Sequence, residues 1–136
     1  MARKTRTYVD TSAFISFLDK SDTYHVLFRR LFSDPPKLLT SALVVSEGQG
    51  WFLKRYDSTR ALQFLAFLED LDPLEIVSVG PKEIEQASVW LRRFGDQPLT
   101  MADAFGLELI KRNRIRRCWS TDRHLTLGGA SLVIHE

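Results

Sequence analysis

The chain has 136 residues, of which 44% are hydrophobic and 26% are charged. This length and apolar content suffice for one compact domain with a sizeable core, and they exclude a largely disordered chain. The formal net charge is +2, with 19 Lys and Arg against 17 Asp and Glu, a balance too even to establish or exclude a nucleic-acid partner.

The cysteine and histidine content excludes two further classes of protein. A single cysteine, Cys118, leaves no internal disulfide, and the three histidines have no recognisable zinc-ligand spacing. Apolar runs such as residues 42–45 are far shorter than the roughly 20 residues that a membrane-spanning helix needs. We therefore expect residues 1–136 to form a single cytoplasmic domain without a membrane association.

The first part of the chain predicts strands that alternate with helices. Residues 5–9 are rich in β-branched and aromatic side chains, which indicates a strand, and Asp10-Thr11-Ser12 offers caps for a helix over 13–18. A helix over 23–32 is ended by Asp34-Pro35-Pro36. The pattern continues with a strand over 37–40 and a helix capped by Ser41 that contains Glu47.

The second part repeats this alternation. It predicts helices over 58–71, 81–94 and 100–111 and strands over 74–79, 117–120 and 132–134. Strands separated by helices favour a parallel sheet covered on both faces, and sites in such sheets form beyond the carboxyl ends of the strands. Asp10 and Asp122 both follow predicted strands.

Four acidic residues are candidates for one site: Asp10, Glu47, Asp103 and Asp122. Carboxylates held close together raise one another's pKa or require a counter-ion. Hard oxygen ligands favour Mg²⁺ or Mn²⁺ over zinc, and such ions activate water for attack on a phosphodiester. A cluster of these four residues would therefore indicate phosphate chemistry.

Each of the four acids also has an ordinary structural interpretation. Asp10 could cap the following helix, and Glu47 could be an exposed salt-bridging residue on a largely apolar helix. Thr100-Met-Ala-Asp103 matches a helix-opening pattern in which a hydroxyl cap is followed three residues later by an acid. Asp122 could be a turn residue. The spacing alone does not decide whether the four converge.

Four short motifs occur in order along almost the whole chain: Tyr8-Val-Asp-Thr-Ser-Ala-Phe-Ile, Ser46-Glu47, Leu99-Thr-Met-Ala-Asp-Ala-Phe and Ser120-Thr-Asp-Arg-His-Leu. On these motifs the chain resembles the PIN-domain ribonucleases, and especially the VapC-type toxins of toxin–antitoxin pairs. One departure is His124-Leu125, where many relatives have a large aromatic residue.

The resemblance implies an α/β fold of three layers, α/β/α, around a central parallel five-stranded sheet. It implies an Mg²⁺- or Mn²⁺-dependent endoribonuclease, with RNA as substrate, a small antitoxin as partner and a homodimeric state. The core acidic positions would be Asp10, Glu47 and Asp103, with Asp122 at a more variable fourth position that is the least expected to hold metal directly. We expect Ser12 and Thr100 to support these acids.

Basic and aromatic residues could contact RNA. Five cations lie between residues 111 and 117, and we expect Arg112, Arg114 and Arg116 among them to bind phosphates, although a solvated helix end is the simpler interpretation. Two smaller basic groups are Arg3, Lys4 and Arg6, and Arg92 and Arg93. Trp51, Phe52, Trp90 and Phe94 could stack on bases, but aromatics at helical spacing are more typical of cores or dimer contacts, so we assign them no catalytic role.

Other functions fit the sequence less well. An aspartyl-phosphatase would need a second acid two residues after Asp10, where Ser12 stands. Gly48-Gln-Gly50 lacks the third glycine of a dinucleotide-binding loop, and no phosphate-binding P-loop pattern occurs. The remaining alternatives are an RNA-processing PIN nuclease outside toxin pairs and a non-catalytic module that binds RNA or a protein partner. The RNA target, the cleavage position and the number of ions do not follow from the sequence.

Overall fold

A parallel sheet forms the centre of the computed structural model, which describes residues 6–136. The sheet has the strand order β3-β2-β1-β4-β5, and every neighbouring pair of strands is parallel. The strands are β1 (Thr7–Val9), β2 (Leu38–Ser41), β3 (Leu74–Val77), β4 (Arg117–Trp119) and β5 (Ser131–Leu132).

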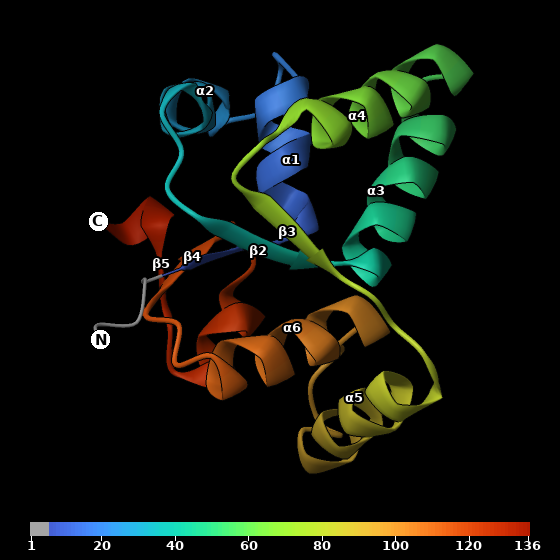
Figure 1. Ribbon diagram of the computed structural model, residues 1–136, viewed down its shortest axis with the longest axis vertical. Coiled ribbons are helices and arrows are strands. Elements are labelled where there is room, and N and C mark those ends of the chain that lie inside the picture. The colour runs from blue at the N-terminus through green and yellow to red at the C-terminus, as the bar shows by residue number, and fades with distance from the viewer. Residues whose placement is uncertain (1–5) are drawn as a thin grey trace.

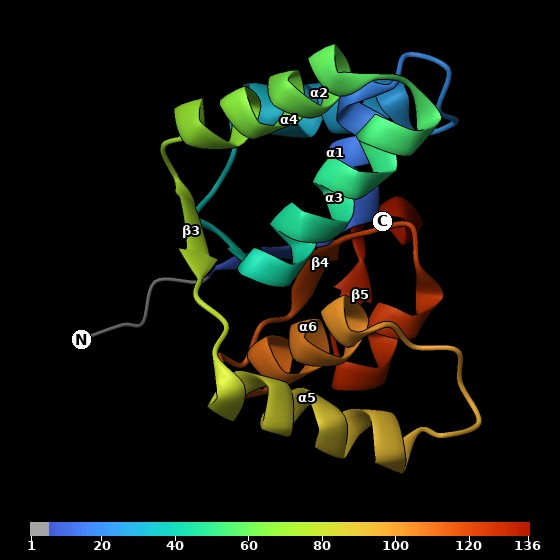
Figure 2. The same cartoon turned by 90° about the vertical axis from the view of Figure 1, so that its right-hand side faces the viewer.

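Helices connect these strands and cover both faces of the sheet. They are α1 (Thr11–Leu18), α2 (His25–Ser33), α3 (Ala42–Arg55), α4 (Ser58–Asp70), α5 (Pro81–Arg93) and α6 (Met101–Arg112), with 3₁₀ helices η1 (Arg123–Gly128) and η2 (Val133–His135). Helices α1 to α4 lie on one side of the sheet, and α5, α6 and η1 lie on the other (Figures 1 and 2).

Alternating side chains of the strands supply two separate cores. Because successive residues of a strand point to opposite faces, Tyr8 packs with α5 and α6, whereas Val9 packs with the helices of the other side. Cys118 and Trp119 of β4 divide in the same way, and Trp119 makes an edge-to-face contact with Phe32, with ring centroids 4.9 Å apart. Both faces of the sheet are thus buried, as the alternation of strands and helices predicts.

The observed elements confirm the predicted fold class and most of the predicted elements. Five parallel strands lie between two helical layers. The first four strands begin and end within two residues of their predicted bounds. The last prediction is wrong in detail, because β5 comprises residues 131–132 and residues 133–135 form η2. Helix η1 was not predicted. None of the helices in the described part of the chain combines the length and the apolar content required to cross a membrane.

Candidate metal centre

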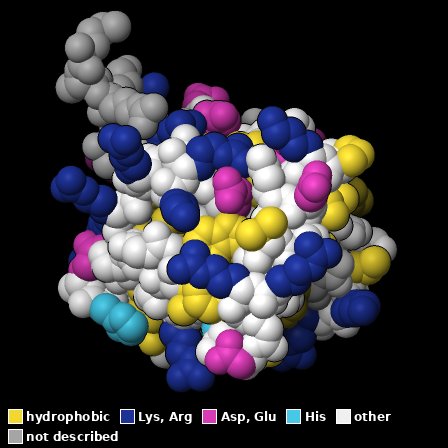
Figure 3. Space-filling view, turned by 90° about the horizontal axis from the view of Figure 1, so that it is seen from below, with side chains coloured by type: hydrophobic (Ala, Val, Ile, Leu, Met, Phe, Trp, Pro, Cys, Tyr) yellow, Lys and Arg dark blue, Asp and Glu magenta, His cyan; other side chains and the backbone are white. Residues whose placement is uncertain are grey.

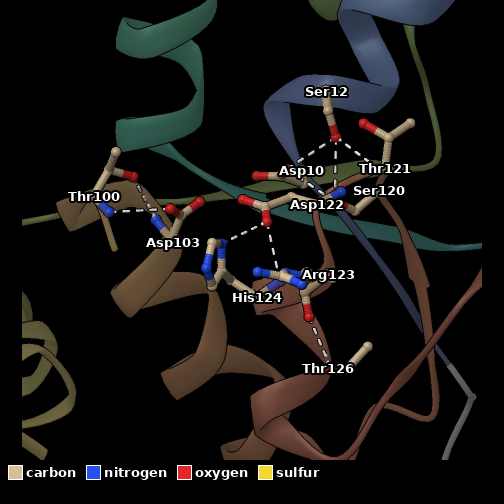
Figure 4. Close-up of polar contacts among 10 residues, drawn as sticks. All are labelled: Asp10, Ser12, Thr100, Asp103, Ser120, Thr121, Asp122, Arg123, His124 and Thr126. Carbon is tan, nitrogen blue, oxygen red and sulfur yellow. Dashed lines mark hydrogen bonds and ion pairs between the residues drawn. The ribbon is translucent and has the colours of Figure 1, made fainter. Parts of the chain in front are cut away.

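Three of the four predicted acids converge at the carboxyl edge of the sheet. Asp10 directly follows β1, Asp122 lies three residues after the end of β4, and Asp103 lies in the first turn of α6. One carboxylate oxygen from each of these residues lies within 4.8 Å of the others (Figure 4). Segments more than a hundred residues apart in sequence therefore meet at a single point.

Strand pairing explains this meeting. Val9 of β1 is in register with Trp119 of the adjacent parallel strand β4, so both strands end at the same edge. The backbone N–H of Asp10 donates to the carbonyl of Trp119 at 3.0 Å, which extends the pairing by one residue and brings Asp10 beside Ser120.

Two serine hydroxyls fix the Asp10 side chain. Ser12 Oγ and Ser120 Oγ each donate to Asp10 Oδ2 at 3.0 Å, and no hydrogen bond from this side chain caps α1. Asp10 thus occupies the N-cap position of α1, but its side chain points to the serines and does not cap the helix. Its other oxygen, Oδ1, is buried and has no hydrogen-bond partner among the described residues. A buried carboxylate oxygen without a donor is unfavourable unless a cation or a proton satisfies it.

Asp103 and Asp122 are held by the caps of their own helices. Asp103 Oδ2 accepts from the backbone N–H of Thr100 at 3.0 Å, and Thr100 Oγ1 accepts from the N–H of Asp103 at 3.1 Å. Asp122 caps η1 by accepting from the N–H of His124 at 3.0 Å, and the same oxygen lies 2.8 Å from His124 Nδ1. The capping interpretation is correct for Asp103, whereas Asp122, which was interpreted as a turn residue, caps η1. Both contacts fix these carboxylates in the cluster.

Burial and mutual repulsion act on the ionisation of these acids. Burial, with the neighbouring charge of Asp103, raises the pKa of Asp10 to about 7, against the opposing hydrogen bonds from Ser12 and Ser120. Burial also raises the pKa of Asp103, to which the charge of Asp122 adds. Both shifts have the direction expected for buried carboxylates that lie beside other acids, and in both cases the ionised form is disfavoured.

Glu47 lies in the wall of the same cavity but outside the group of three. The cavity has a volume of about 330 Å³ and is lined by Asp10, Thr11, Ser12, Ile15, Glu47, Trp51, Thr100, Asp103 and Asp122. Thr11 Oγ1 donates a hydrogen bond to Glu47 Oε1, so a hydroxyl and not a basic residue holds this carboxylate. From the sequence we expected Glu47 to be a core acid and Asp122 to be the least direct ligand. In the structure Asp122 belongs to the close group of three acids and Glu47 does not.

Three polar residues of this site were not predicted: Thr11, Ser120 and His124. Thr11 binds Glu47, Ser120 links Asp10 to the backbone N–H of Asp122, and His124 pairs with Asp122. Ser120 had a usable signal, because it ends a predicted strand two residues before an acid. Thr11 and His124 had none beyond their closeness to an acid in sequence.

The basic residues expected to bind RNA lie away from the acids. Arg112 is the last residue of α6, whereas Asp103 lies in its first turn, and a rise of about 1.5 Å per residue separates them by about 13 Å. Arg112 donates to Gln86 and forms an ion pair with Glu108, while Arg114 and Arg116 are exposed. Arg3 and Lys4 lie outside the described residues. Seen from the side of α5, Lys and Arg side chains are spread over the surface with acidic side chains between them (Figure 3).

The donor set fits a hard divalent cation. Three carboxylates supply oxygen atoms at short mutual distances, and one oxygen is already buried without a hydrogen-bond donor. Oxygen-only sites of this kind are typical of Mg²⁺ and Mn²⁺. The fold and the site together define an α/β protein with an acidic centre at the carboxyl edge of a parallel sheet.

Comparison with known proteins places this architecture in a family. The model of the PIN domain matches residues 7–126, and the chain belongs to the PIN-domain family. It is 29% identical to ribonuclease VapC26 of Mycobacterium tuberculosis over 116 residues, which cover 85% of each protein.

Solved structures share the fold. The toxin VapC20 of Mycobacterium tuberculosis, described as cleaving the sarcin–ricin loop, matches with a TM-score of 0.82 and 22% identity over 92% of this chain and 96% of its own. VapBC2 of Rickettsia felis, bound to a promoter DNA fragment, matches with a TM-score of 0.64 and 14% identity over 94% of this chain and 97% of its own. The resemblance to VapC-type proteins noted in the sequence is thereby confirmed.

Proposed function

We propose that this protein is a metal-dependent endoribonuclease and the toxin of a type II toxin–antitoxin pair. The observation that carries this proposal is the convergence of Asp10, Asp103 and Asp122, with a buried Asp10 oxygen that no described residue satisfies. Membership of the PIN-domain family and the likeness to ribonuclease VapC26 support RNA as the substrate.

Asp10, Asp103 and Asp122 would hold Mg²⁺ or Mn²⁺, with Glu47 in the cavity wall available to bind through water. A bound divalent cation supplies an activated water and neutralises charge that develops on the phosphodiester. The protein contributes positioning: Ser12 and Ser120 both bind Oδ2 of Asp10, so that Oδ1, which has no hydrogen-bond partner among the described residues, would be available to a cation. Thr100 performs the same task for Asp103 through its cap.

The same comparisons support the partners that we propose. The structures with similar folds include a toxin–antitoxin complex from Klebsiella pneumoniae, with a TM-score of 0.60, and VapBC2 of Rickettsia felis. By this likeness we propose that a small antitoxin binds the chain, that two copies form a homodimer and that the complex is cytoplasmic. Light scattering on the purified protein, with and without its co-expressed antitoxin, measures both assemblies.

Cleavage assays test the nuclease proposal. The purified protein is incubated with total ribosomal RNA and with a sarcin–ricin stem-loop, in Mg²⁺ or Mn²⁺, with and without EDTA. We expect cleavage that EDTA abolishes and that Asp10→Asn and Asp103→Asn each reduce by more than about 100-fold, since changes to residues that only support metal ligands already cost about 10- to 100-fold.

Glu75→Gln is the matched control, because it neutralises an exposed carboxylate that is absent from the acidic cavity. Its activity should equal that of the wild type. Cleavage that resists EDTA, or full activity in both Asp variants, would show that the acidic cluster is not the catalytic site. Growth arrest on expression of the wild type, but not of Asp103→Asn, tests the role as a toxin.

A further inference from the structure

A second hollow lies beside the acidic cavity, along one side of α3. It has a volume of about 570 Å³ and is lined by Ser46, Glu47, Gly50, Trp51, Lys54 and Arg55. We call it the α3 groove. Glu47 and Trp51 line the acidic cavity as well, so the two hollows share a wall. A polymer bound at the acids can therefore continue into the α3 groove.

The floor of the α3 groove is open because residue 50 is a glycine. Glycine inside a helix is about 1 kcal/mol less favourable than alanine, so it needs a structural or functional reason. At Gly48 the reason is packing, since an added Cβ would lie 2.4 Å from Cζ of Phe64. At Gly50 an added Cβ would meet no described atom within 4 Å. Packing within the described chain thus accounts for Gly48 and leaves Gly50 unexplained.

Trp51 presents an aromatic ring at the junction of the two hollows. It is only partly buried, and its ring contacts with Phe52 and Tyr56 are both of the edge-to-face type, with interplanar angles of 84° and 66°. Trp90, in contrast, is buried in a core and stacks on Phe94 with an interplanar angle of 16°. Trp51 packs partly against the core, but it lines both hollows and has no parallel-stacked aromatic partner among the described residues, so part of the indole surface can meet a planar ligand.

Charge changes sign along the groove. Glu47 and the acidic cluster lie at one end, and the exposed cations Lys54 and Arg55 lie at the other. Seven residues of helix, at a rise of about 1.5 Å each, separate Glu47 from Lys54 by about 10 Å. An aromatic surface between a metal-type site and a cationic end matches a nucleotide strand, which carries a flat base and an anionic phosphate in each unit.

We propose that the α3 groove binds the single-stranded RNA segment next to the scissile phosphate, with a base stacked on Trp51 and a phosphate at Lys54 and Arg55. This inference rests on the proposed ribonuclease function and assigns to the same site a substrate subsite that the acids alone do not provide. Trp51 is thereby a binding residue, and Gly50 serves by leaving room for the base.

Equilibrium binding tests the groove without requiring cleavage. The probe is a fluorescein-labelled single-stranded oligoribonucleotide of mixed sequence, titrated in Ca²⁺ and followed by fluorescence anisotropy. We expect Trp51→Leu and Gly50→Leu each to raise the Kd about tenfold, within the range measured for the loss of one base–aromatic stack. Lys54→Glu should also lower the salt dependence of binding, by about one to two phosphate contacts.

Matched controls separate these effects from folding and from general charge. Gly50→Ala adds only a methyl group to the same open position and favours the helix, so it should fold, and its loss of RNA affinity should be smaller than that of Gly50→Leu. Arg29→Glu reverses an exposed cation on α2, outside both hollows, and controls for Lys54→Glu. A fully abasic strand should bind the wild type about tenfold more weakly than the normal strand, and should bind Trp51→Leu and the wild type almost equally.

Two results would overturn the proposal. One is wild-type RNA affinity in both Trp51→Leu and Gly50→Leu. The other is a changed sedimentation coefficient in either groove variant with no change in its RNA binding, which would mean that the groove is a contact between copies of the chain. Groove-dependent binding by a wild type that cleaves no RNA would contradict the nuclease proposal alone, whereas EDTA-sensitive cleavage unaffected by both substitutions would contradict the groove alone.

Discussion

The two edges of the sheet differ in how their charged residues are buried and paired. At the carboxyl edge, Asp10 and Asp103 are 3% and 7% exposed and lie beside another acid. Near the amino edge, Arg6 and Glu75 form an ion pair of 2.7 Å while their side chains remain 31% and 61% exposed. The first arrangement concentrates one sign of charge in a buried place, and the second pairs opposite signs in water.

This difference indicates which edge has a function. Exposed, paired charges cost little to maintain and add little stability, so they need no explanation beyond solubility. Buried like charges lower stability unless something else is bound. The cavity near the amino edge, of about 480 Å³, is larger than the acidic one, yet its charged residues include both signs: Arg6, Lys37, Asp72 and Glu75. The sign and burial of the charges, and not the size of a cavity, distinguish the functional edge.

The largest expected effect is stabilisation by a divalent cation. A ligand that binds only the folded protein at about 100 times its Kd raises the free energy of unfolding by about 2.7 kcal/mol. We expect Mg²⁺ or Mn²⁺ to raise the melting temperature of the wild type at pH 8, measured by differential scanning fluorimetry. Asp10→Asn should abolish most of this shift and Glu75→Gln should retain it. An equal shift in both variants would locate the ion away from the carboxyl edge.

The pH dependence of stability without metal follows from Asp10. Burial raises the pKa of Asp10 from its ordinary value of 3.8 to about 7, so between these values the folded state holds more protons than the unfolded state. Stability in EDTA should therefore fall as pH rises from about 4 to about 7.

Denaturant unfolding at several pH values measures this slope. Asp10→Asn removes the titrating group, and at pH 8 in EDTA it should be more stable than the wild type by roughly 1–3 kcal/mol, the cost of a buried polar group without partners. A wild type whose stability rises over this range, with an Asp10→Asn variant that is less stable at pH 8, would show that the carboxylate is satisfied within the protein.

Arg112 and Arg114 flank Asn113, whose side chain accepts a hydrogen bond from Arg6 near the amino edge. Charge reversal at these two residues therefore tests whether the amino edge also has a function. If these residues bind RNA as the sequence suggests, Arg112→Glu and Arg114→Glu should each weaken binding severalfold and lower its salt dependence by about one phosphate contact or more. Anisotropy titrations over a range of salt concentrations measure both quantities. A clear effect would break the contrast between the edges, and no effect would restrict RNA contact to the carboxyl edge.

The smallest effect is expected for the exposed ion pair of Arg6 and Glu75. A double-mutant cycle with Arg6→Ala and Glu75→Ala should give a coupling free energy below about 1 kcal/mol, because both side chains are partly solvated. High salt should reduce it further. RNA cleavage should be unchanged in Glu75→Ala. A coupling free energy several times larger would mean that this ion pair contributes substantially to the stability of the folded protein.

The sequence alone determined the layered parallel sheet and the identity of the acids. Periodicity sets which segments become strands and helices, and caps such as Ser41 and Thr100 mark where helices begin, because both are local properties. The order of four short motifs along the chain indicated the resemblance to the PIN-domain family. The prediction of the final strand was wrong in its bounds, because residues 131–134 are too few for their pattern to distinguish a strand from a 3₁₀ turn.

Only the tertiary structure decided which residues meet. The register of Val9 with Trp119 brings Ser120 to Asp10, and no local pattern contains that long-range pairing. Asp10 is buried there and its Oδ1 has no hydrogen-bond partner among the described residues, so a residue at a helix N-cap position becomes a group that needs a cation or a proton. The position of Trp51, partly packed against a core and lining two hollows, is likewise a property of packing that helical spacing alone does not predict.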